Sequence, residues 1–341
     1  MTCAPAIGAL LALAIAATLV LGSWLFFSHA GLLFDPIFPP FATLASFACA
    51  TVAGYRRAEK DKAQIRDAFG RYVSPAVIEA LVADPSKLRL GGDIKPITVL
   101  FSDIRNFTQR SERMPANEVV RFLNAVHTPL SEAVMTTGGT VDKYIGDGMM
   151  AFWNAPLDDP DHVRNALRAA LIMTERLPRI AENLTANHHV SEESSLALGV
   201  GIHTGPACVG NLGSTNRFDY SIVGDTVNSA ARIEPLCKDY GAPIIVSSAI
   251  VEAAPDFAYL EIDDVALRGR QAPMRVFALL GDQERARDRN FLAWKALHDG
   301  ALAALRSGAP DAAAQIAGCA KRPDAVKLLA VYEKWRAQIA S

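Results

Sequence analysis

The chain has 341 residues, enough for one large domain or two smaller ones. Its net charge of −2 lacks the basic excess of nucleic-acid binders, so we expect no nucleic-acid partner. The five cysteines are scattered without a CxxC pair, which favours small buried side chains in a reducing compartment.

The N-terminus is expected to lie in a membrane. Residues 6–27 carry no charge and, at about 1.5 Å per helical residue, span the roughly 30 Å hydrocarbon core of a bilayer. A second uncharged run, 37–55, is interrupted early by Pro39 and Pro40 and is followed at once by basic residues, which favours a cytoplasmic location for that end. We therefore expect residues 1–57 to form two transmembrane helices with a short external loop.

This interpretation predicts a multi-pass protein of the cell inner membrane, with the rest of the chain in the cytoplasm. A cleaved signal peptide is the weaker alternative, because the stretch before the first apolar run has no Lys or Arg and a second apolar run follows.

Residues 58–94 are expected to link the membrane segments to the first strand. Residues 59–69 fit equally a helix that pairs with its twin in a dimer and a solvated linker helix. Ser74 and Pro75 begin a second short helix, and Gly91 and Gly92 are expected to form a hinge.

Residues 95–282 alternate between strand and helix patterns and are expected to form one domain. The predicted order is a strand (96–103), a helix (116–136), a hairpin (140–145 and 149–153), a helix (160–184) and a strand (196–203). This order predicts a ferredoxin-like α+β fold, which hosts many functions. Further strands are expected at 207–210, 218–223, 242–246 and within 257–280, with a helix at 225–238.

The C-terminal residues 285–341 change character. Three Ala-rich stretches are expected to be helical, at 291–306, 311–320 and 324–339. They resemble a tetratricopeptide-type helical hairpin and predict a small tail that packs on the protein or binds a partner.

Two aspartates are the first candidates for chemistry. Asp103 closes the strand at 96–103, and Asp147 lies in the Gly-Asp-Gly turn of the hairpin. A strand end places a carboxylate rigidly, and two converging carboxylates repel each other unless positive charge lies between them. Each aspartate alone is more often a cap, but together they predict a metal and a phosphate-bearing substrate.

Three further polar side chains have plain alternatives. Lys143 lies four residues before Asp147, and a lone lysine is usually a solvated cation. Asn228 and Arg232 are four apart in the predicted helix and share a face. They can orient a ribose and neutralise a transferring phosphoryl group, or form a surface pair of no special function.

The motifs in combination resemble the class III nucleotidyl cyclases, in order and spacing across residues 95–280. They are FSDIRNFT (101–108), KYIGDG (143–148), GIHTG (201–205) and SIVGDTVNSAAR (221–232). FGRYVSP (69–75) and LGGD (90–93) are similar to the segment that precedes the catalytic domain in bacterial membrane-bound adenylate cyclases.

The resemblance implies metal ligands and a reaction. Asp103, Asp147 and the backbone carbonyl of Ile104 would hold two Mg²⁺ or Mn²⁺ ions in each active site. The ribose 3′-oxygen of ATP would attack the α-phosphorus, and pyrophosphate would leave, giving 3′,5′-cyclic AMP.

The resemblance also implies substrate-binding residues. Lys143 and Ser221 would read the purine, and a lysine at that position favours ATP over GTP. Asn228 would orient the ribose and Arg232 would stabilise the transition state, while Phe107 and Arg270 would bind substrate. The metal aspartates would come from one protomer and the other groups from its partner, so a homodimer would carry two sites.

Two positions depart from the family pattern. Asn106 stands where Gly is usual, and Asn tolerates left-handed backbone better than most residues. Pro206 replaces a residue that is commonly polar or charged.

Three alternatives stay open beside an active adenylate cyclase: a catalytically inactive nucleotide sensor, a guanylate cyclase, and a diguanylate cyclase. The last is disfavoured, because the Gly-Gly-Asp triplet at 91–93 precedes the first strand.

Overall fold

The structure is a computed structural model that describes residues 3–31, 35, 37–69, 90–186, 196–214, 217–266 and 272–340. The chain divides into two compact units, residues 1–78 and 79–341. The short helix expected after Ser74 and the side chain of Arg270 lie outside the described residues.

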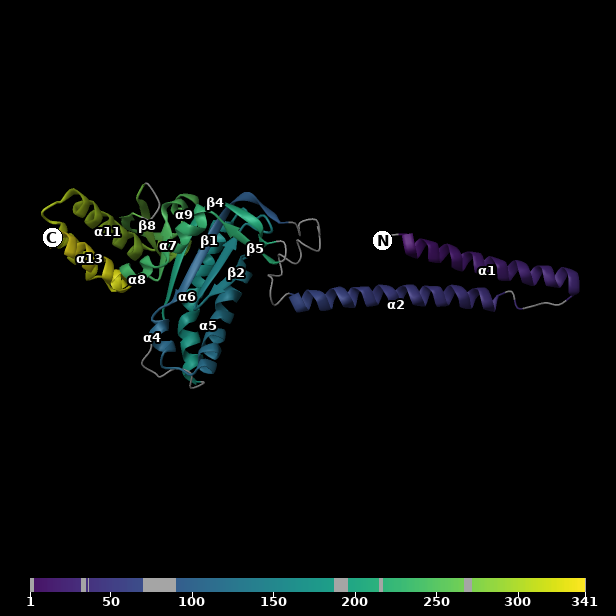
Figure 1. The fold of residues 1–341 in the computed structure, drawn as a ribbon. Coiled ribbons are helices and arrows are strands. Elements are labelled where there is room, and N and C mark those ends of the chain that lie inside the picture. The colour runs from purple at the N-terminus through teal and green to yellow at the C-terminus, as the bar shows by residue number, and fades with distance from the viewer. Residues whose placement is uncertain are drawn as a thin grey trace. The chain divides into compact units, whose positions relative to one another are not determined.

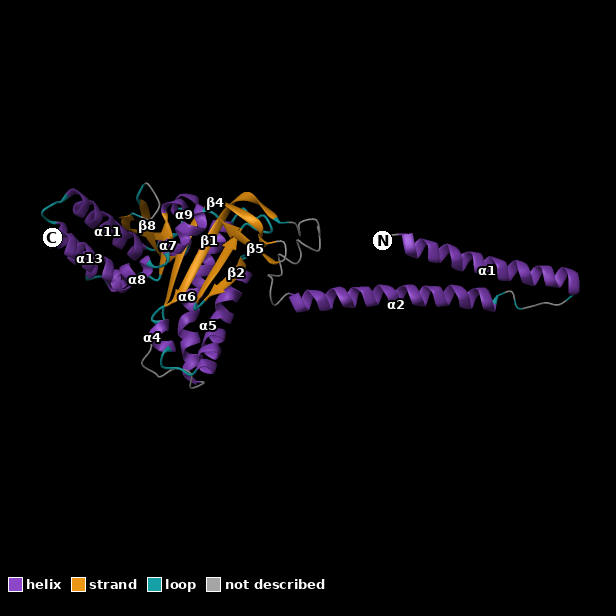
Figure 2. Ribbon diagram, viewed as in Figure 1, coloured by secondary structure: helices purple, strands orange, loops and turns teal. Residues whose placement is uncertain are grey.

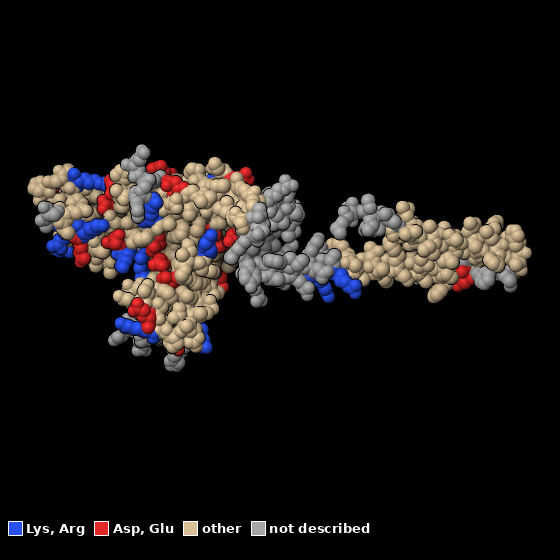
Figure 3. Space-filling model, in the orientation of Figure 1, with Lys and Arg blue, Asp and Glu red and all other residues tan. Residues whose placement is uncertain are grey.

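The first unit is a pair of helices, α1 (Cys3–Ala30) and α2 (Phe38–Phe69), that lie side by side (Figure 1). One helix in the described part of the chain, within Gly8–Ala30, is long and apolar enough to cross a membrane. Few charged atoms lie along the pair before the basic residues of α2 (Figure 3). The expected second transmembrane span is not confirmed.

Helix α2 continues without a break from the second apolar run through the expected linker helix to Phe69. Pro39 and Pro40 do not interrupt it, since they lie in its first turn, where backbone N–H groups have no partner within the helix. Asp35 caps this end by accepting hydrogen bonds from the backbone N–H groups of Ile37 (2.8 Å) and Phe38 (3.1 Å).

The second unit is built on an antiparallel sheet with the spatial order β2-β3-β1-β4. Helix α5 connects β1 to β2 and helix α6 connects β3 to β4, which gives the expected ferredoxin-like element order. The bounds are β1 Gly91–Ile104, α5 Ala116–Thr136, β2 Thr140–Ile145, β3 Gly148–Trp153, α6 His162–Ala186 and β4 Leu198–Ser214, with a short helix α4 at Phe107–Ser111.

The sheet continues beyond β4. Strand β6 (Ile244–Ser247) lies parallel to β4, followed by β8 (Met274–Gly281) and β7 (Ala258–Val265), while β5 (Arg217–Val223) pairs with the far half of β4. The helices between these strands are α7 (Asp225–Ile233), α8 (Leu236–Tyr240) and α9 (Ser248–Ala253). Helix α9 was not expected from the sequence.

Four expected boundaries were wrong for reasons that involve proline or glycine. The helix expected at 225–238 is two helices, because Pro235 cannot continue the first. The strands expected at 196–203 and 207–210 are one, since Pro206 lies opposite Pro96, where neither residue has an N–H to leave unpaired. The expected hinge at Gly91 and Gly92 is part of β1, paired with β4. The helix expected at 324–339 begins as a 3₁₀ turn, η2 (Pro323–Leu328), before α13 (Leu329–Ala340).

Helices cover both faces of the sheet, and β1 contributes side chains to both cores (Figure 2). Leu100 and Ile104 of β1 pack in the core that includes residues of α5 and α6, whereas Ile97 and Val99 pack with Ala230 of α7. Side chains alternate along a strand, so Asp103 projects from the same face of β1 as Ile97 and Val99.

The C-terminal helices pack on the sheet. They are α10 (Gln283–Arg287), α11 (Arg289–Ser307), α12 (Ala312–Ala320), η2 and α13. Trp294 and Trp335 share a core with Leu260 and Ile262 of β7. The likeness to a tetratricopeptide hairpin stays a prediction.

Candidate active site

The pairing of β1 with β3 brings Asp103 and Asp147 together. Ser102 lies opposite Met149, so the end of β1 lies beside the turn that joins β2 to β3. Burial raises the pKa of Asp103 to about 6, helped by the negative charge of Asp147 and a hydrogen bond between the two carboxyl groups, while Arg105 opposes the shift. The ionised form of Asp103 is therefore less favourable than that of a carboxyl group in water.

The close approach of these strands requires a glycine at 148. A Cβ atom added there would lie 2.8 Å from the carbonyl oxygen of Ser102 and 3.7 Å from Oδ1 of Asp103. On the other side, Asn106 has φ 58°, the left-handed backbone that its Asn was expected to tolerate, and α4 begins directly after it. The turn after Asp103 therefore forms without a glycine.

The donor atoms of this pair suit a hard divalent cation. Carboxylate oxygens are preferred ligands of Mg²⁺ and Mn²⁺, and a cation would relieve the repulsion that raises the pKa of Asp103. The side chain of Ile104 is buried in the core, so only its backbone can face the site. Within the described residues no group of three or more His, Cys, Asp and Glu side chains forms a metal cage. The site thus fits a metal that keeps water or substrate oxygens as ligands.

An ion pair joins the end of β1 to the end of α7. Arg105 donates to Glu234 Oε1 at 2.8 Å, joining β1 to the residue that follows α7. Both side chains are largely buried, and burial raises the pKa of Glu234 to about 7 against the lowering effect of Arg105. Gly199 leaves the space for the Arg105 guanidinium, which a Cβ atom at that position would meet directly.

The two expected purine-reading residues meet at a third residue, Asp142. Ser221 on β5 donates its hydroxyl hydrogen to Asp142 Oδ2 at 2.6 Å, and Lys143 Nζ lies 3.3 Å from Asp142 Oδ1. The Asp142 side chain is 1% exposed and that of Lys143 is 48% exposed. The register of β2 against β3 shifts between Val141 and Lys143, so Asp142 occupies a bulge, and bulges re-aim side chains.

Helix α7 presents the expected catalytic residues. Asn228 is exposed and Arg232 is half-buried one turn later, and no ion pair to Arg232 occurs among the described side chains. Thr226 donates to the carbonyl oxygen of Pro206 at 2.6 Å, which ties the start of α7 to β4. The backbone carbonyl of Pro206 thus makes a structural contact with α7.

Phe107 lies apart from these polar groups. Its ring stacks on Phe122 of α5 at 5.9 Å between ring centroids and packs against the main core. Its expected contact with substrate stays a prediction.

The expected residues form separate groups in one chain. Asp103 lies with Asp147, Lys143 with Ser221, and Asn228 with Arg232. In the described part of the chain, no hydrogen bond or ion pair joins the aspartate pair to Lys143, Ser221, Asn228 or Arg232.

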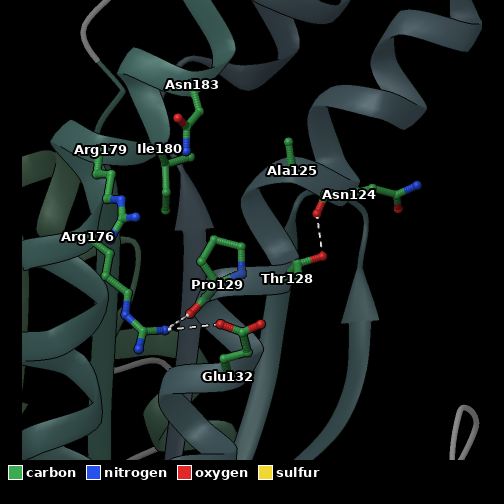
Figure 4. A pocket seen from close by; sticks show the side chains of 9 residues that line it. All are labelled: Asn124, Ala125, Thr128, Pro129, Glu132, Arg176, Arg179, Ile180 and Asn183. Carbon is green, nitrogen blue, oxygen red and sulfur yellow. Dashed lines mark hydrogen bonds and ion pairs between the residues drawn. The ribbon is translucent and has the colours of Figure 1, made fainter. Parts of the chain in front are cut away.

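Two hollows occur in the described structure, and the second is lined by Tyr144 and Gly146, the neighbours in sequence of Lys143 and Asp147. One, of about 580 Å³, opens between α5 and α6, where Arg176 donates to the Pro129 carbonyl oxygen at 2.6 Å and pairs with Glu132 at 3.7 Å (Figure 4). The other, of about 440 Å³, is lined by His127 and Tyr144. The expected site residues do not line either hollow.

Three supporting residues were missed by the sequence reasoning: Arg105, Glu234 and Asp142. A charged residue beside a strand-end aspartate, as Arg105 is, could have been flagged. Asp142 precedes Lys143 in the sequence, but strict alternation would have placed the two on opposite faces, and the bulge lets Asp142 contact both Lys143 and Ser221.

Known proteins resemble this chain over the same region. A match to the family "Adenylate and Guanylate cyclase catalytic domain" covers residues 92–281. The chain is 35% identical over 186 residues to adenylate cyclase 1 of Rhizobium meliloti, covering 54% of this chain and 27% of that protein. It is 31% identical over 217 residues to an adenylate cyclase of Anabaena cylindrica, covering 62% of this chain and 42% of that protein. The chain thus spans well under half the length of these curated relatives.

Solved structures agree with the sequence matches. The guanylyl cyclase Cya2 is 33% identical with a TM-score of 0.51, over 57% of this chain and 95% of that one. The adenylyl cyclase CyaB from P. aeruginosa is 28% identical with a TM-score of 0.51, over 56% of this chain and 96% of that one. With the match covering residues 92–281, the chain belongs to the adenylate and guanylate cyclase catalytic domain family.

Proposed function

We propose that this protein is an adenylate cyclase, which converts ATP to 3′,5′-cyclic AMP and pyrophosphate. The observation that carries the proposal is the Asp103–Asp147 pair, in which the neighbouring carboxylate helps raise the pKa of Asp103 to about 6. Such a pair favours a divalent cation with open positions for phosphate and ribose oxygens.

The reaction closes a ring within one nucleotide. The ribose 3′-oxygen forms a bond to the α-phosphorus, the bond from that phosphorus to the bridging oxygen of the β-phosphate breaks, and the 3′-hydroxyl proton passes to water. Two Mg²⁺ or Mn²⁺ ions would lower the pKa of the 3′-hydroxyl and neutralise the triphosphate.

The chain's own residues have separate tasks in this proposal. Asp103, Asp147 and the backbone carbonyl of Ile104 hold the metal ions. Asn228 orients the ribose, and Arg232 stabilises negative charge that develops on the α-phosphate. Arg270 binds the terminal phosphates, and Phe107 contacts the substrate.

Lys143 and Ser221 select the base. Lysine only donates hydrogen bonds, which suits the N1 acceptor of adenine and not the N1–H of guanine. The relatives named as adenylate cyclases, at 35% and 31% identity, support this choice. A guanylate cyclase is the second candidate, because the similar structure of Cya2 is that of a guanylyl cyclase.

The active protein is proposed to be a homodimer with both sites shared. Asp103 and Asp147 would come from one protomer, with Lys143, Ser221 and the α7 residues from its partner.

The N-terminal helices are proposed to anchor this dimer in the cell inner membrane as a two-helix hairpin, with the catalytic domain in the cytoplasm. The apolar stretch within Gly8–Ala30 supports one span, and the uncharged first part of α2, which ends at Arg56, supports the second. With this arrangement the chain would belong to the bacterial membrane-bound subgroup of adenylate cyclases.

The test is a product assay on purified full-length protein in detergent or vesicles, given ATP or GTP with Mg²⁺ or Mn²⁺. We expect cyclic AMP from ATP, little cyclic GMP from GTP, and a loss of at least about a hundredfold in Asp103→Ala and Asp147→Ala. Cyclic GMP as the main product would favour the second candidate. Nucleotide binding without either product would contradict a cyclase and support an inactive nucleotide sensor.

A further inference from the structure

We infer that Asp142 sets the base specificity of this protein through Ser221: its carboxylate takes the only hydroxyl hydrogen of Ser221 and thereby makes that oxygen an obligatory hydrogen-bond acceptor. The inference rests on the proposed function and names a residue that the family comparison does not assign. Asp142 is a positioning residue, because its side chain is 1% exposed and does not reach solvent.

A serine hydroxyl does not by itself distinguish the two purines. A hydroxyl has one hydrogen to donate and two lone pairs that accept, so a free serine can face either a donor or an acceptor on a base. Adenine presents its N6 amino group, a donor, where guanine presents O6, an acceptor. A serine free to rotate therefore discriminates poorly between the two purines.

The contact with Asp142 removes the rotational freedom of the Ser221 hydroxyl. Ser221 donates to Asp142 Oδ2 at 2.6 Å, a distance typical of a charge-assisted hydrogen bond. In this hydrogen bond the Ser221 hydroxyl is the donor and the Asp142 oxygen is the acceptor. The lone pairs that remain on the Ser221 oxygen can only accept, which matches the adenine amino group and opposes guanine O6.

The other oxygen of the same carboxylate faces Lys143. Asp142 Oδ1 is buried and has no hydrogen-bond partner among the described residues, and Lys143 Nζ lies 3.3 Å from it without hydrogen-bond geometry. The attraction holds the exposed ammonium beside Ser221 while its N–H bonds stay available to a ligand. The bulge residue Asp142 thus arranges a donor, the Lys143 ammonium, and an acceptor, the Ser221 oxygen, in the pattern that complements the adenine edge.

Asp142→Asn is the informative substitution, because it reverses the direction of the hydrogen bond with Ser221 without changing the shape of the side chain. The ammonium of Lys143 favours the amide oxygen on its side, which turns the amide NH₂ toward Ser221. Ser221 then accepts from Asn and points its own hydrogen outward, toward the position of guanine O6. We expect kcat/KM for ATP divided by kcat/KM for GTP to fall by at least about tenfold, mainly through a higher KM for ATP.

The control for this substitution is Asp219→Asn, the same change at an exposed position of β5, which should leave the ratio unaltered. If Asp142 had only a structural role, its substitution would lower kcat/KM for ATP and kcat/KM for GTP by the same factor. In a Ser221→Ala background, Asp142→Asn should have no further effect on the ratio, because the hydroxyl that carries the effect is gone. An equal further drop in that background would overturn the inference.

A second pair of variants keeps the inference testable if Asp142→Asn folds poorly. Ser221→Thr retains the hydroxyl and should keep the ATP preference, while Ser221→Ala should lose about tenfold of it. Equal ratios in the two variants would overturn the inference.

Binding separates this inference from the proposed function. Affinities are measured with 3′-deoxy-ATP and 3′-deoxy-GTP and Mn²⁺, since these nucleotides lack the attacking hydroxyl. A wild-type protein that forms no cyclic product contradicts the proposed function, yet its affinity ratio still reports on Asp142. An affinity ratio that is the same in wild type and Asp142→Asn contradicts the inference whether or not the protein is a cyclase.

Discussion

The folded surroundings of Asp103 make its ionised form less favourable. Burial and the neighbouring carboxylate raise the pKa of Asp103 to about 6, above its ordinary value of 3.8. The folded, metal-free protein therefore binds this proton more tightly than the unfolded chain does. The stability that this bound proton contributes is fully present below about pH 4 and is lost as the pH rises through about 6.

The Asp103→Asn variant tests this balance. At pH 7.5 in EDTA the variant should have a Tm about 2–4 °C above wild type, because an unfavourable buried charge is gone. Added Mn²⁺ should raise the Tm of wild type and leave that of the variant unchanged. Thermal unfolding of both proteins with and without Mn²⁺ measures this, with Asp219→Asn as the control. An equal shift with Mn²⁺ in the variant would place the metal elsewhere.

Much of the candidate site could be predicted from single residues in their motifs. Asp103, Asp147, Lys143 and Ser221 stand in motifs whose spacing is visible in the sequence, and the structure pairs them two by two. Asp142 could not be predicted, because its role depends on a one-residue slip in strand register that has no signal in the local sequence.

At the scale of elements, the Arg105–Glu234 pair fixes the end of β1 to the end of α7. The distance is 2.8 Å, and the exposed fractions of the two side chains are 17% and 12%. Because burial raises the pKa of Glu234 to about 7, the pair is fully ionised only above that pH. Removal of one partner leaves the other charge largely buried without compensation.

We therefore expect Glu234→Ala to lower the free energy of unfolding at pH 8 by roughly 3 kcal/mol. The matched control is Asp256→Ala, which breaks the more exposed pair with Arg164 and should cost less than about 1 kcal/mol. Urea unfolding monitored by tryptophan fluorescence gives both values. Similar losses in the two variants would show that burial of the first pair has no energetic consequence.

The tail offers a second test between elements. Tyr332 accepts a hydrogen bond from Trp294 at 2.9 Å and contacts the buried His298 at 2.9 Å, while the other ring nitrogen of His298 lies 2.6 Å from the carbonyl oxygen of Glu261 on β7. Tyr332→Phe leaves two buried polar groups unpaired and should cost about 1–3 kcal/mol. Denaturant unfolding measures the loss, and a loss near zero would show that these buried hydrogen bonds do not stabilise the tail.

The fold was predictable where hydrophobic periodicity is strong and uninterrupted. The helix expected at 116–136 matches α5, and the hairpin strands match β2 and β3 to within one residue. Expectations failed where proline acted in an unexpected way: Pro235 ended α7, whereas Pro206 did not end β4. Local patterns do not reveal that a proline faces another proline across a strand pair.

At the scale of the whole molecule, residues 92–281 belong to a cyclase catalytic domain family, while the N-terminal helices and the tail lie outside that match. If the helices anchor the protein, the full chain should remain with membranes after a high-salt wash, and a variant that lacks residues 1–57 should be released. Fractionation of cells that express each form measures this. Release of the full chain by salt would contradict the membrane hairpin.

The central claim is that two copies of this chain complete each catalytic site. The direct measurement mixes Asp103→Ala protein with Arg232→Ala protein and follows cyclic AMP from ATP with Mn²⁺. Each variant alone should be inactive. Heterodimers should regain activity, up to about half of the wild-type rate per dimer, because one of their two sites carries every group. Heterodimers that form but make no cyclic AMP would contradict the shared site.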